Sequence, residues 1–400
     1  MKYDFSTTPR RNNCGSVKWN QMKQINPDLP DDIIPFSVAD MDFLNPPEII
    51  EGLRAYLTTA VLGYTQATDD YLMAVCNWMS KRHDWKIDKD WIIPTSGVVP
   101  ALYLAVTCFT KPGDGVIIQT PVYYPFYSAI SDANRSIAGN SLIYNNGLYS
   151  IDFEDFENKA KDPKNKVFIL CNPHNPVGRV WTHDELARLG QICCENNVLI
   201  VSDDIHFDLI MPGFQHTVIA KISEEIANNT LVCTAPSKSF NLAGLQASNI
   251  IIPNKELREQ FYKHYDANGN FVLNCMAYEG CKIAYTQCEN WLDEAIAVID
   301  SNRQYIEEYL SNNHPYIKVT RMEGTYLLWM DFRELGVDYK ELEIKMQNAN
   351  LFFDEGYVFG DDGIGFERMN LACPRSELEK AMARLTPVIH SIISQKEVFV

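Results

Sequence analysis

The chain has 400 residues, 46% of them hydrophobic, and its formal net charge is −17, from 35 Lys and Arg against 52 Asp and Glu. This composition excludes a disordered chain, and the length allows a large core without stabilising disulfides. The acidic balance argues against general nucleic-acid binding, which depends on Lys and Arg, and the length allows two or three domains.

The N-terminal ten residues lack the apolar stretch of a secretory signal, and no apolar run reaches the ~20 residues of a membrane span. The chain has 11 Cys, none of them in a C-x-x-C pair, and the adjacent Cys193 and Cys194 do not form a zinc ribbon. We therefore expect free thiols in a reducing compartment and no metal site. The expected protein is soluble and cytoplasmic, with no nucleic-acid or membrane partner.

Residues 1–45 are rich in Asn, Pro and Asp, and we expect them to be irregular. Helices are expected from Pro46, because prolines suit a helix start, and over 69–82. Short apolar runs typical of buried strands then alternate with amphipathic stretches. This pattern predicts an α/β fold with a mostly parallel sheet covered on both faces, which binds ligands beyond the carboxyl ends of its strands. The expected strands are 91–93, 115–119, 167–171, 198–202, 231–234 and 249–252, and the intervening helices are 98–109, 124–131 and 184–195.

The pattern changes after a long helix expected over about 289–310. Strand-like and helical segments mix there, which predicts a smaller α+β domain. The strands are expected at 317–320, 326–331 and 365–371, and the helices at 338–348 and 375–394. We expect a large domain over 46–288 and a small domain over 289–400, which the N-terminal segment 1–45 joins.

Five segments that each follow an expected strand carry the side chains of a candidate binding site. The first segment, 94–98, precedes a helix, whose free N–H groups favour an anion, although an ordinary turn has the same pattern. Aromatic rings in the second segment, 120–127, either stack on a planar ligand or pack in the core. Two Asn-Pro steps make the third a rigid turn, which either shapes the chain or holds two Asn side chains as donors. The first three segments are 94–98, 120–127 and 172–178.

The last two segments, 201–206 and 234–244, contain charged residues beside buried strands. A carboxylate such as Asp203 is costly there unless it meets a cation or several donors, and the alternative is a helix cap or a solvated strand end. Lys238 lies among small and apolar neighbours, so its amine is either a desolvated nucleophile that forms a Schiff base or a group that reaches the surface.

Taken together, these segments resemble the fold-type-I pyridoxal-phosphate (PLP) enzymes of the class I/II aminotransferase-like superfamily, and most closely its carbon–sulfur β-lyases of the MalY/PatB type. The resemblance spans nearly the whole chain, in order, and it implies the family's large domain with a mostly parallel seven-stranded sheet. The supporting segments are 38–43, 63–65, 202–206, 237–245 and 368–375.

The resemblance implies a role for each matching residue. Lys238 matches the Schiff-base lysine, whose free amine takes the substrate's Cα proton. Asp203 matches the carboxylate that pairs with the pyridine nitrogen. Asn175 and His206 match positions that hydrogen-bond the ring's 3-oxygen, and Tyr123 matches the residue that stacks on the ring.

The phosphate contacts implied by the resemblance are Ser96, Gly97 and Val98 at a helix start, with Ser237. The chain departs here from many aminotransferases, because it has Ala235 where they have Ser, and it has no Arg between residues 239 and 257. The sequence therefore leaves open which cation, if any, helps to hold the phosphate.

The implied substrate contacts are Arg368, for the α-carboxylate, together with Asn175 and Tyr64. Tyr64 matches a catalytic tyrosine that reaches the partner subunit's site, which implies a homodimer with shared active sites. The implied substrate is a small amino acid.

The implied activity is α,β-elimination from cystathionine or another cysteine S-conjugate, which yields a thiol (homocysteine from cystathionine), pyruvate and ammonia. The alternatives are a PLP-dependent aminotransferase and a PLP-binding regulatory protein. A nucleotide-binding α/β protein without PLP is disfavoured, because no G-x-G-x-x-G or G-x-x-x-x-G-K-[ST] phosphate loop is present.

Overall fold

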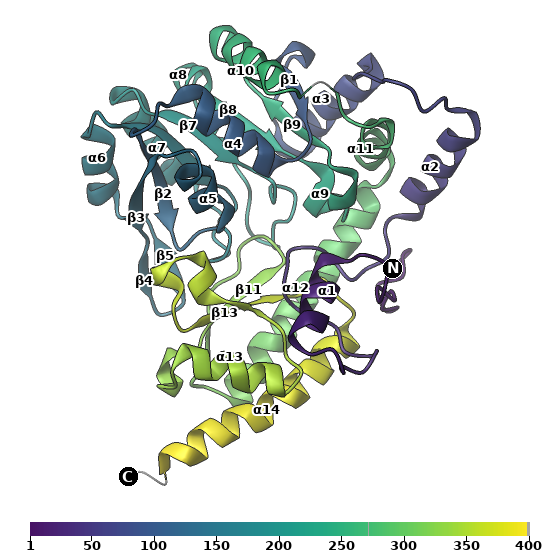
Figure 1. The fold of residues 1–400 in the computed structure, drawn as a ribbon, viewed down its shortest axis with the longest axis vertical. Helices are drawn as coiled ribbons and strands as arrows, with labels where there is room; N and C mark the ends of the chain where they lie inside the picture. The colour runs from purple at the N-terminus through teal and green to yellow at the C-terminus, as the bar shows by residue number, and fades with distance from the viewer. Residues whose placement is uncertain (271, 398–400) are drawn as a thin grey trace.

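The computed structural model describes residues 1–270 and 272–397, so Phe271 of the expected large domain and residues 398–400 of the expected small domain lie outside the described residues. Its largest element is a seven-stranded sheet in the order β1-β9-β8-β7-β6-β2-β3 (Figure 1). Only β9 runs antiparallel to its neighbours, so the expected mostly parallel sheet is confirmed. The strands are β1 (Ile92–Thr95), β2 (Gly115–Thr120), β3 (Ser136–Ser141), β6 (Asn165–Cys171), β7 (Leu199–Asp203), β8 (Thr230–Thr234) and β9 (Ser248–Ile251).

Helices cover both faces of this sheet, because the central strands are apolar on both sides. In β6, Val167 and Ile169 pack toward one set of helices, whereas Phe168 and Leu170 pack toward the other. This alternation follows from the two-residue period of a strand. The first set is α4 (Val98–Phe109), α5 (Pro125–Ser131) and α10 (Lys255–Ala267), and the second is α6 (Phe153–Lys161) and α7 (His183–Glu195).

A second, antiparallel sheet of four strands has the order β10-β11-β13-β12 and lies in the lower half of Figure 1. Leu327, Leu328, Met330 and Met369 of this sheet join the largest apolar cluster together with residues of the surrounding helices, whereas Trp329 and Phe366 pack in the cluster that contains α6 and α7. The strands are β10 (Lys318–Val319), β11 (Leu327–Asp331), β12 (Asp354–Glu355) and β13 (Phe366–Asn370), and the helices are α12 (Glu289–Asn313), α13 (Tyr339–Asn348) and α14 (Arg375–Glu397).

The N-terminal segment differs from the expectation that it is irregular, because it contains the helix α1 (Val17–Ile25). This helix has no side-chain cap at Ser16 and no acidic residue in its first turn, so its sequence carries no start signal, and its formation depends on burial of Trp19 and Met22. Further along, Phe36 donates a backbone hydrogen bond to Phe352 O (2.8 Å) and accepts one from Asn370 N (2.9 Å). These contacts support our proposal that residues 1–45 join a small domain at 289–400, with 46–288 forming the large domain.

The remaining elements surround these sheets or connect them. Within the described ranges, no helix combines the length and the apolar character needed to cross a membrane. The remaining helices are α2 (Pro47–Thr59), α3 (Asp69–His83), α8 (Glu224–Asn228), α9 (Pro236–Ser239) and α11 (Cys275–Gln287), and β4 (Ile143–Asn145) pairs with β5 (Leu148–Ser150) as a hairpin.

Candidate active site

A cavity of about 270 Å³ lies where the strands of the large sheet end and helices α4 and α9 begin. Parallel strands bring their carboxyl ends to one edge, so residues far apart in the sequence meet there. Nine of the expected site residues line the cavity together: Ser96, Gly97, Val98, Tyr123, Asn175, Asp203, His206, Ser237 and Lys238.

Lys238 lies in the short helix α9 and reaches the cavity from the carboxyl end of β8. Its Nζ donates a 2.6 Å hydrogen bond to the carbonyl oxygen of Ala39. Burial lowers the pKa of this amine to about 8, with Arg368 adding to the effect and the carboxylates of Asp40 and Asp203 opposing it. A substantial fraction of the amine is therefore neutral near pH 7–8, which a nucleophile or a general base requires.

Asp203 is the last residue of β7 and is almost fully buried. Its Oδ1 accepts one backbone hydrogen bond, from Ile205 N at 3.1 Å. Burial, together with the neighbouring Asp204, raises the pKa of its carboxyl to about 7, against the effect of the Ile205 N–H and Lys238. A buried carboxyl with so few donors fits a cationic ring nitrogen, which would restore its ionised form.

The N-terminus of α4 faces the same cavity. Gly97 caps this twelve-residue helix with φ +125°, a conformation in which glycine is favoured, and the adjacent Ser96 and Val98 line the cavity. The free N–H groups of the first turn and the hydroxyl of Ser237 are suited to an anion. Among the described lining residues, Lys238 is the only cationic side chain, so the helix N–H groups are the main source of positive potential for an anion.

His206 and Asn175 provide polar groups on the cavity wall, and both are almost fully buried. Burial, with the nearby cations of Lys238 and Arg368, holds the pKa of His206 well below its usual value, so its ring is neutral. Its Nδ1 is buried without a hydrogen-bond partner. An orphaned donor or acceptor of this kind is suited to a polar ligand atom.

Arg368 projects from β13 of the small sheet and is almost fully buried next to the cavity lining. Its Nη1 donates to Asn175 Oδ1 at 2.8 Å, its Nη2 pairs with Asp354, and its Nε has no partner. A buried guanidinium with an unused N–H is suited to a carboxylate ligand.

Tyr64 is the one expected site residue that is exposed at the surface. It is fully exposed, at 105% relative accessibility, and it does not line the cavity. Its neighbours Val61 and Leu62 are also strongly exposed.

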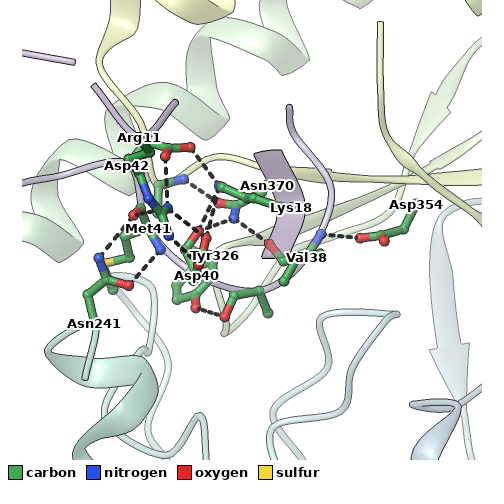
Figure 2. A network of polar contacts seen from close by, with 12 residues as sticks. Arg11, Lys18, Val38, Asp40, Met41, Asp42, Asn241, Tyr326, Asp354 and Asn370 are labelled. Atoms are coloured by element: carbon green, nitrogen blue, oxygen red, sulfur yellow. Dashed lines mark hydrogen bonds and ion pairs between the residues drawn. The ribbon is translucent and has the colours of Figure 1, made fainter. Parts of the chain in front are cut away.

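Sequence reasoning missed several residues of the cavity wall. Ala39 comes from the N-terminal segment, whose residues 38–42 are enclosed by charged and amide side chains (Figure 2). Gln246 lines the cavity eight residues after Lys238, within the stretch 239–257 that has no Arg. The position of Gln246 near the lysine was a usable signal. Ala39 lies in segment 38–43, which supports the family resemblance, but its side chain does not indicate a site, since its backbone makes the contact. Cys171, Ile205 and Ala243 also line the cavity.

The chain belongs to the aminotransferase class I and II family, whose model matches residues 31–385. It is 42% identical over 334 residues to cystathionine beta-lyase PatB of Bacillus subtilis (strain 168), covering 84% of this chain and 86% of that protein. Protein MalY of Escherichia coli (strain K12) is 30% identical over 393 residues, covering 98% of this chain and 100% of MalY. These findings confirm the family resemblance seen in the sequence.

Solved structures agree over nearly the full length. The crystal structure of cystalysin from Treponema denticola, which contains a pyridoxal 5'-phosphate cofactor, superposes with a TM-score of 0.97 at 50% identity, covering 98% of this chain and 100% of that chain. The PLP-bound putative aminotransferase from Clostridium difficile 630 has a TM-score of 0.93 at 42% identity, covering 97% of this chain and 100% of that chain.

Proposed function

We propose that the protein is a PLP-dependent carbon–sulfur β-lyase that cleaves cystathionine or another cysteine S-conjugate to a thiol, pyruvate and ammonia. One observation carries the proposal: a half-buried amine, Lys238, and a buried carboxyl, Asp203, line one cavity in a chain that is 50% identical to cystalysin in a match covering 98% of its length. The curated relatives named cystathionine beta-lyase support the same reaction class.

The cavity residues fit PLP by the chemistry of their donors and acceptors. Asp203, short of hydrogen bonds, fits the protonated ring nitrogen, and the orphaned Nδ1 of His206 fits the ring's polar oxygen together with Asn175. Tyr123 provides a ring for stacking. The phosphate fits the start of α4, at Ser96, Gly97 and Val98, and the hydroxyl of Ser237. Bound there, PLP supplies an electron sink for the carbanion formed at the substrate's Cα.

The protein's own residues bind and orient the amino acid and move its proton. Arg368 binds the α-carboxylate through its guanidinium, which Asn175 and Asp354 hold in place. The neutral Nζ of Lys238 takes the Cα proton, the Cβ–S bond breaks, and its electrons leave with the thiolate. The ammonium of Lys238 returns its proton to the thiolate, which leaves as the thiol, and water converts the remaining three-carbon fragment into pyruvate and ammonia.

We further propose a homodimer in which Tyr64 acts as a catalytic and substrate-binding residue in the partner's site. The exposure of Tyr64, Val61 and Leu62 supports this proposal, because adjacent large apolar side chains at a surface are typical of an interface. A cytoplasmic location remains part of the proposal, and it is supported by the free state of all eleven cysteines, which lie within the described ranges.

An aminotransferase is the second candidate, favoured by the family model and by the neighbour described as a putative aminotransferase. The two reactions share proton removal by Lys238 and differ in what the carbanion does next. The test incubates the PLP-loaded protein with cystathionine and, separately, with amino donors plus 2-oxoglutarate. We expect free thiol and pyruvate in equal amounts from cystathionine. Glutamate formation without thiol or pyruvate would overturn the lyase assignment.

A further inference from the structure

The carbonyl oxygen of Ala39 is a hydrogen-bond acceptor inside the cavity wall. It accepts from the Nζ of Lys238 at 2.6 Å and from the hydroxyl of Tyr326 at 2.8 Å. Ala39 itself lines the cavity, and Tyr326 is fully buried. A backbone oxygen is in direct contact with the amine on which the proposed reaction depends.

Ion pairs, buried at Lys18 and Asp42 and partly exposed at Arg11 and Asp40, hold the residues that follow Ala39. Lys18, whose side chain is 0% exposed, contacts Asp42 at 2.6 Å and Asp40 at 3.2 Å, and its Nζ also donates to the carbonyl of Asp40 at 3.0 Å. Arg11 pairs with the same two carboxylates, at 2.7 Å to Asp40 and 3.1 Å to Asp42 (Figure 2). Two cations thus balance two carboxylates, which offsets the cost of desolvating them.

The backbone on the other side of Ala39 is strained and held by side chains. Val38 has φ +54°, a left-handed conformation that is rare for a β-branched residue. Its N–H donates to Asp354 Oδ2 at 3.0 Å, and Asn370 Nδ2 donates to the carbonyls of Val38 (2.9 Å) and Asp40 (2.7 Å). Strain of this kind persists where the surroundings fix the chain, and it is concentrated at functional sites.

The same segment is bonded to the turn that directly follows α9, the helix that carries Lys238. Met41 N donates to Asn241 Oδ1, and Asn241 Nδ2 donates to Met41 O, both at 2.9 Å. Asn241 lies three residues after Lys238. Two sets of contacts therefore restrain the position of the Ala39 carbonyl relative to α9: its own hydrogen bond with Lys238, and the bonds between Met41 and Asn241.

We propose that residues 38–42 hold the Ala39 carbonyl as the fixed acceptor for the free amine of Lys238, and that Lys18 and Asn370 are positioning residues which act on Lys238 through this carbonyl. The inference rests on the proposed function, in which this amine breaks the substrate's Cα–H bond and forms a new N–H bond. The carbonyl restricts rotation of the neutral amine, and it stabilises the ammonium once the proton has moved.

Several charged groups face Lys238 from different elements and shift its pKa. The proposed role of the Ala39 carbonyl can be distinguished from the direct effect of these charges by the sign of the pKa shift. Asp40, from the N-terminal segment, and Asp203, from β7, favour the ammonium, whereas Arg368, from β13, disfavours it, and His206 is neutral. Loss of the Lys18 cation by itself raises the pKa of any nearby ammonium. Displacement of the Ala39 carbonyl lowers the pKa of Lys238, because the ammonium loses an acceptor. The two causes have opposite signs.

The test measures the reactivity of Lys238 directly in the full-length protein. Cofactor-free protein is labelled with trace acetic anhydride across pH 6–10, and peptide mapping gives the pH midpoint for Lys238. We expect Lys18→Met and the uncharged change Asn370→Ala each to lower this midpoint by about one pH unit, the effect of losing one charge-assisted hydrogen bond. Lys23→Met is the matched control on α1, since Lys23 pairs only with Asp31 among the described ion pairs, and we expect it to leave the midpoint unchanged.

A midpoint that rises in Lys18→Met or stays constant in Asn370→Ala overturns the inference; Asn370→Ala decides the matter if Lys18→Met does not fold. A separate arm labels the PLP-loaded wild-type protein, in which we expect Lys238 to be protected. Equal labelling with and without PLP contradicts the proposed function, whereas the midpoints of the variants test only the role of residues 38–42.

Discussion

Arg368 donates a 2.8 Å hydrogen bond to Asn175, so a strand of the small sheet contacts the loop that follows β6 of the large sheet. The residue proposed to bind the substrate carboxylate is thereby fixed to a residue proposed to contact the cofactor. One hydrogen bond thus joins the proposed substrate-binding residue to a proposed cofactor-binding residue.

Replacement Arg368→Lys is expected to raise KM by about 10–100-fold, because lysine keeps the charge but loses the bidentate geometry and the bond to Asn175. A smaller fall in kcat is expected, since Lys238 is unchanged. Steady-state kinetics with cystathionine measures both. Arg321→Lys is the control, because Arg321 is largely exposed and pairs with Glu323 at 3.7 Å. An unchanged KM in Arg368→Lys would contradict the role in substrate binding.

PLP affinity is expected to depend on pH through Asp203. Burial raises the pKa of this carboxyl to about 7, so it is ionised above that pH and protonated below it. Affinity for a cationic ring should therefore fall by up to about tenfold per unit as pH drops below 7. The measurement is PLP binding in a Lys238→Ala background, where the amine does not titrate; loss of its charge also raises the pKa of Asp203, so the fall in affinity should begin above pH 7 in this background. Asp203→Asn should weaken binding at pH 8 by about 10–100-fold and remove the pH dependence; an identical slope in that variant would refute the pairing.

The neighbouring glutamates of the small sheet should make stability depend on pH. Glu355 and Glu367 are directly paired across β12 and β13, and burial raises the pKa of Glu355 to about 7 and that of Glu367 well above its usual value. In the folded state these carboxyls keep protons that they lose near pH 4.5 in the unfolded chain. Their contribution to the free energy of unfolding is therefore fully present below about pH 4.5, and it is lost as the pH rises toward 7 and beyond.

Glu367→Gln is accordingly expected to stabilise the protein at pH 7 by about 1–3 kcal/mol and to have little effect at pH 4.5. Thermal unfolding at both pH values tests this expectation. Glu379→Gln, at an exposed position on α14, is the control. Equal effects of Glu367→Gln at the two pH values would show that ionisation of this pair does not limit stability.

Shared active sites can be tested by complementation. Tyr64→Ala and Lys238→Ala are each expected to be inactive as homodimers. In a mixed dimer, one of the two sites combines the intact Lys238 of one chain with the intact Tyr64 of the other, so the purified mixed dimer should recover about half of wild-type activity. Co-expression with two different tags and an assay of the doubly purified protein measures this. No recovery in a verified mixed dimer would contradict a Tyr64 contribution across the interface.

The fold was largely predictable where strands are buried on both faces and helices have clear signals. Apolar runs such as 115–119 and 167–171 became β2 and β6, and Pro46–Pro47 marks the start of α2 as expected. Trp91, by contrast, lies in a short 3-10 turn before β1 rather than in the strand, because a single aromatic residue does not define a boundary. Helix α1 was missed, since tertiary packing rather than local sequence stabilises it.

The site was predictable where side chains carry the chemistry. Lys238, Asp203 and His206 stand out as polar residues beside buried strands, and the structure brings them to one cavity. The contribution of Ala39 was not predictable, because its backbone oxygen acts through a conformation set by Lys18 and Asn370, far away in sequence. The contact of Tyr64 in the proposed dimer likewise depends on a second chain and not on the residues next to it in sequence.

The most direct test of the whole account is borohydride reduction of the PLP-loaded protein, followed by peptide mapping. The account predicts one stable phosphopyridoxyl group, attached to the Nζ of Lys238, and none in Lys238→Ala. A label on another lysine, or no label on a protein that retains its cofactor and activity, would contradict it.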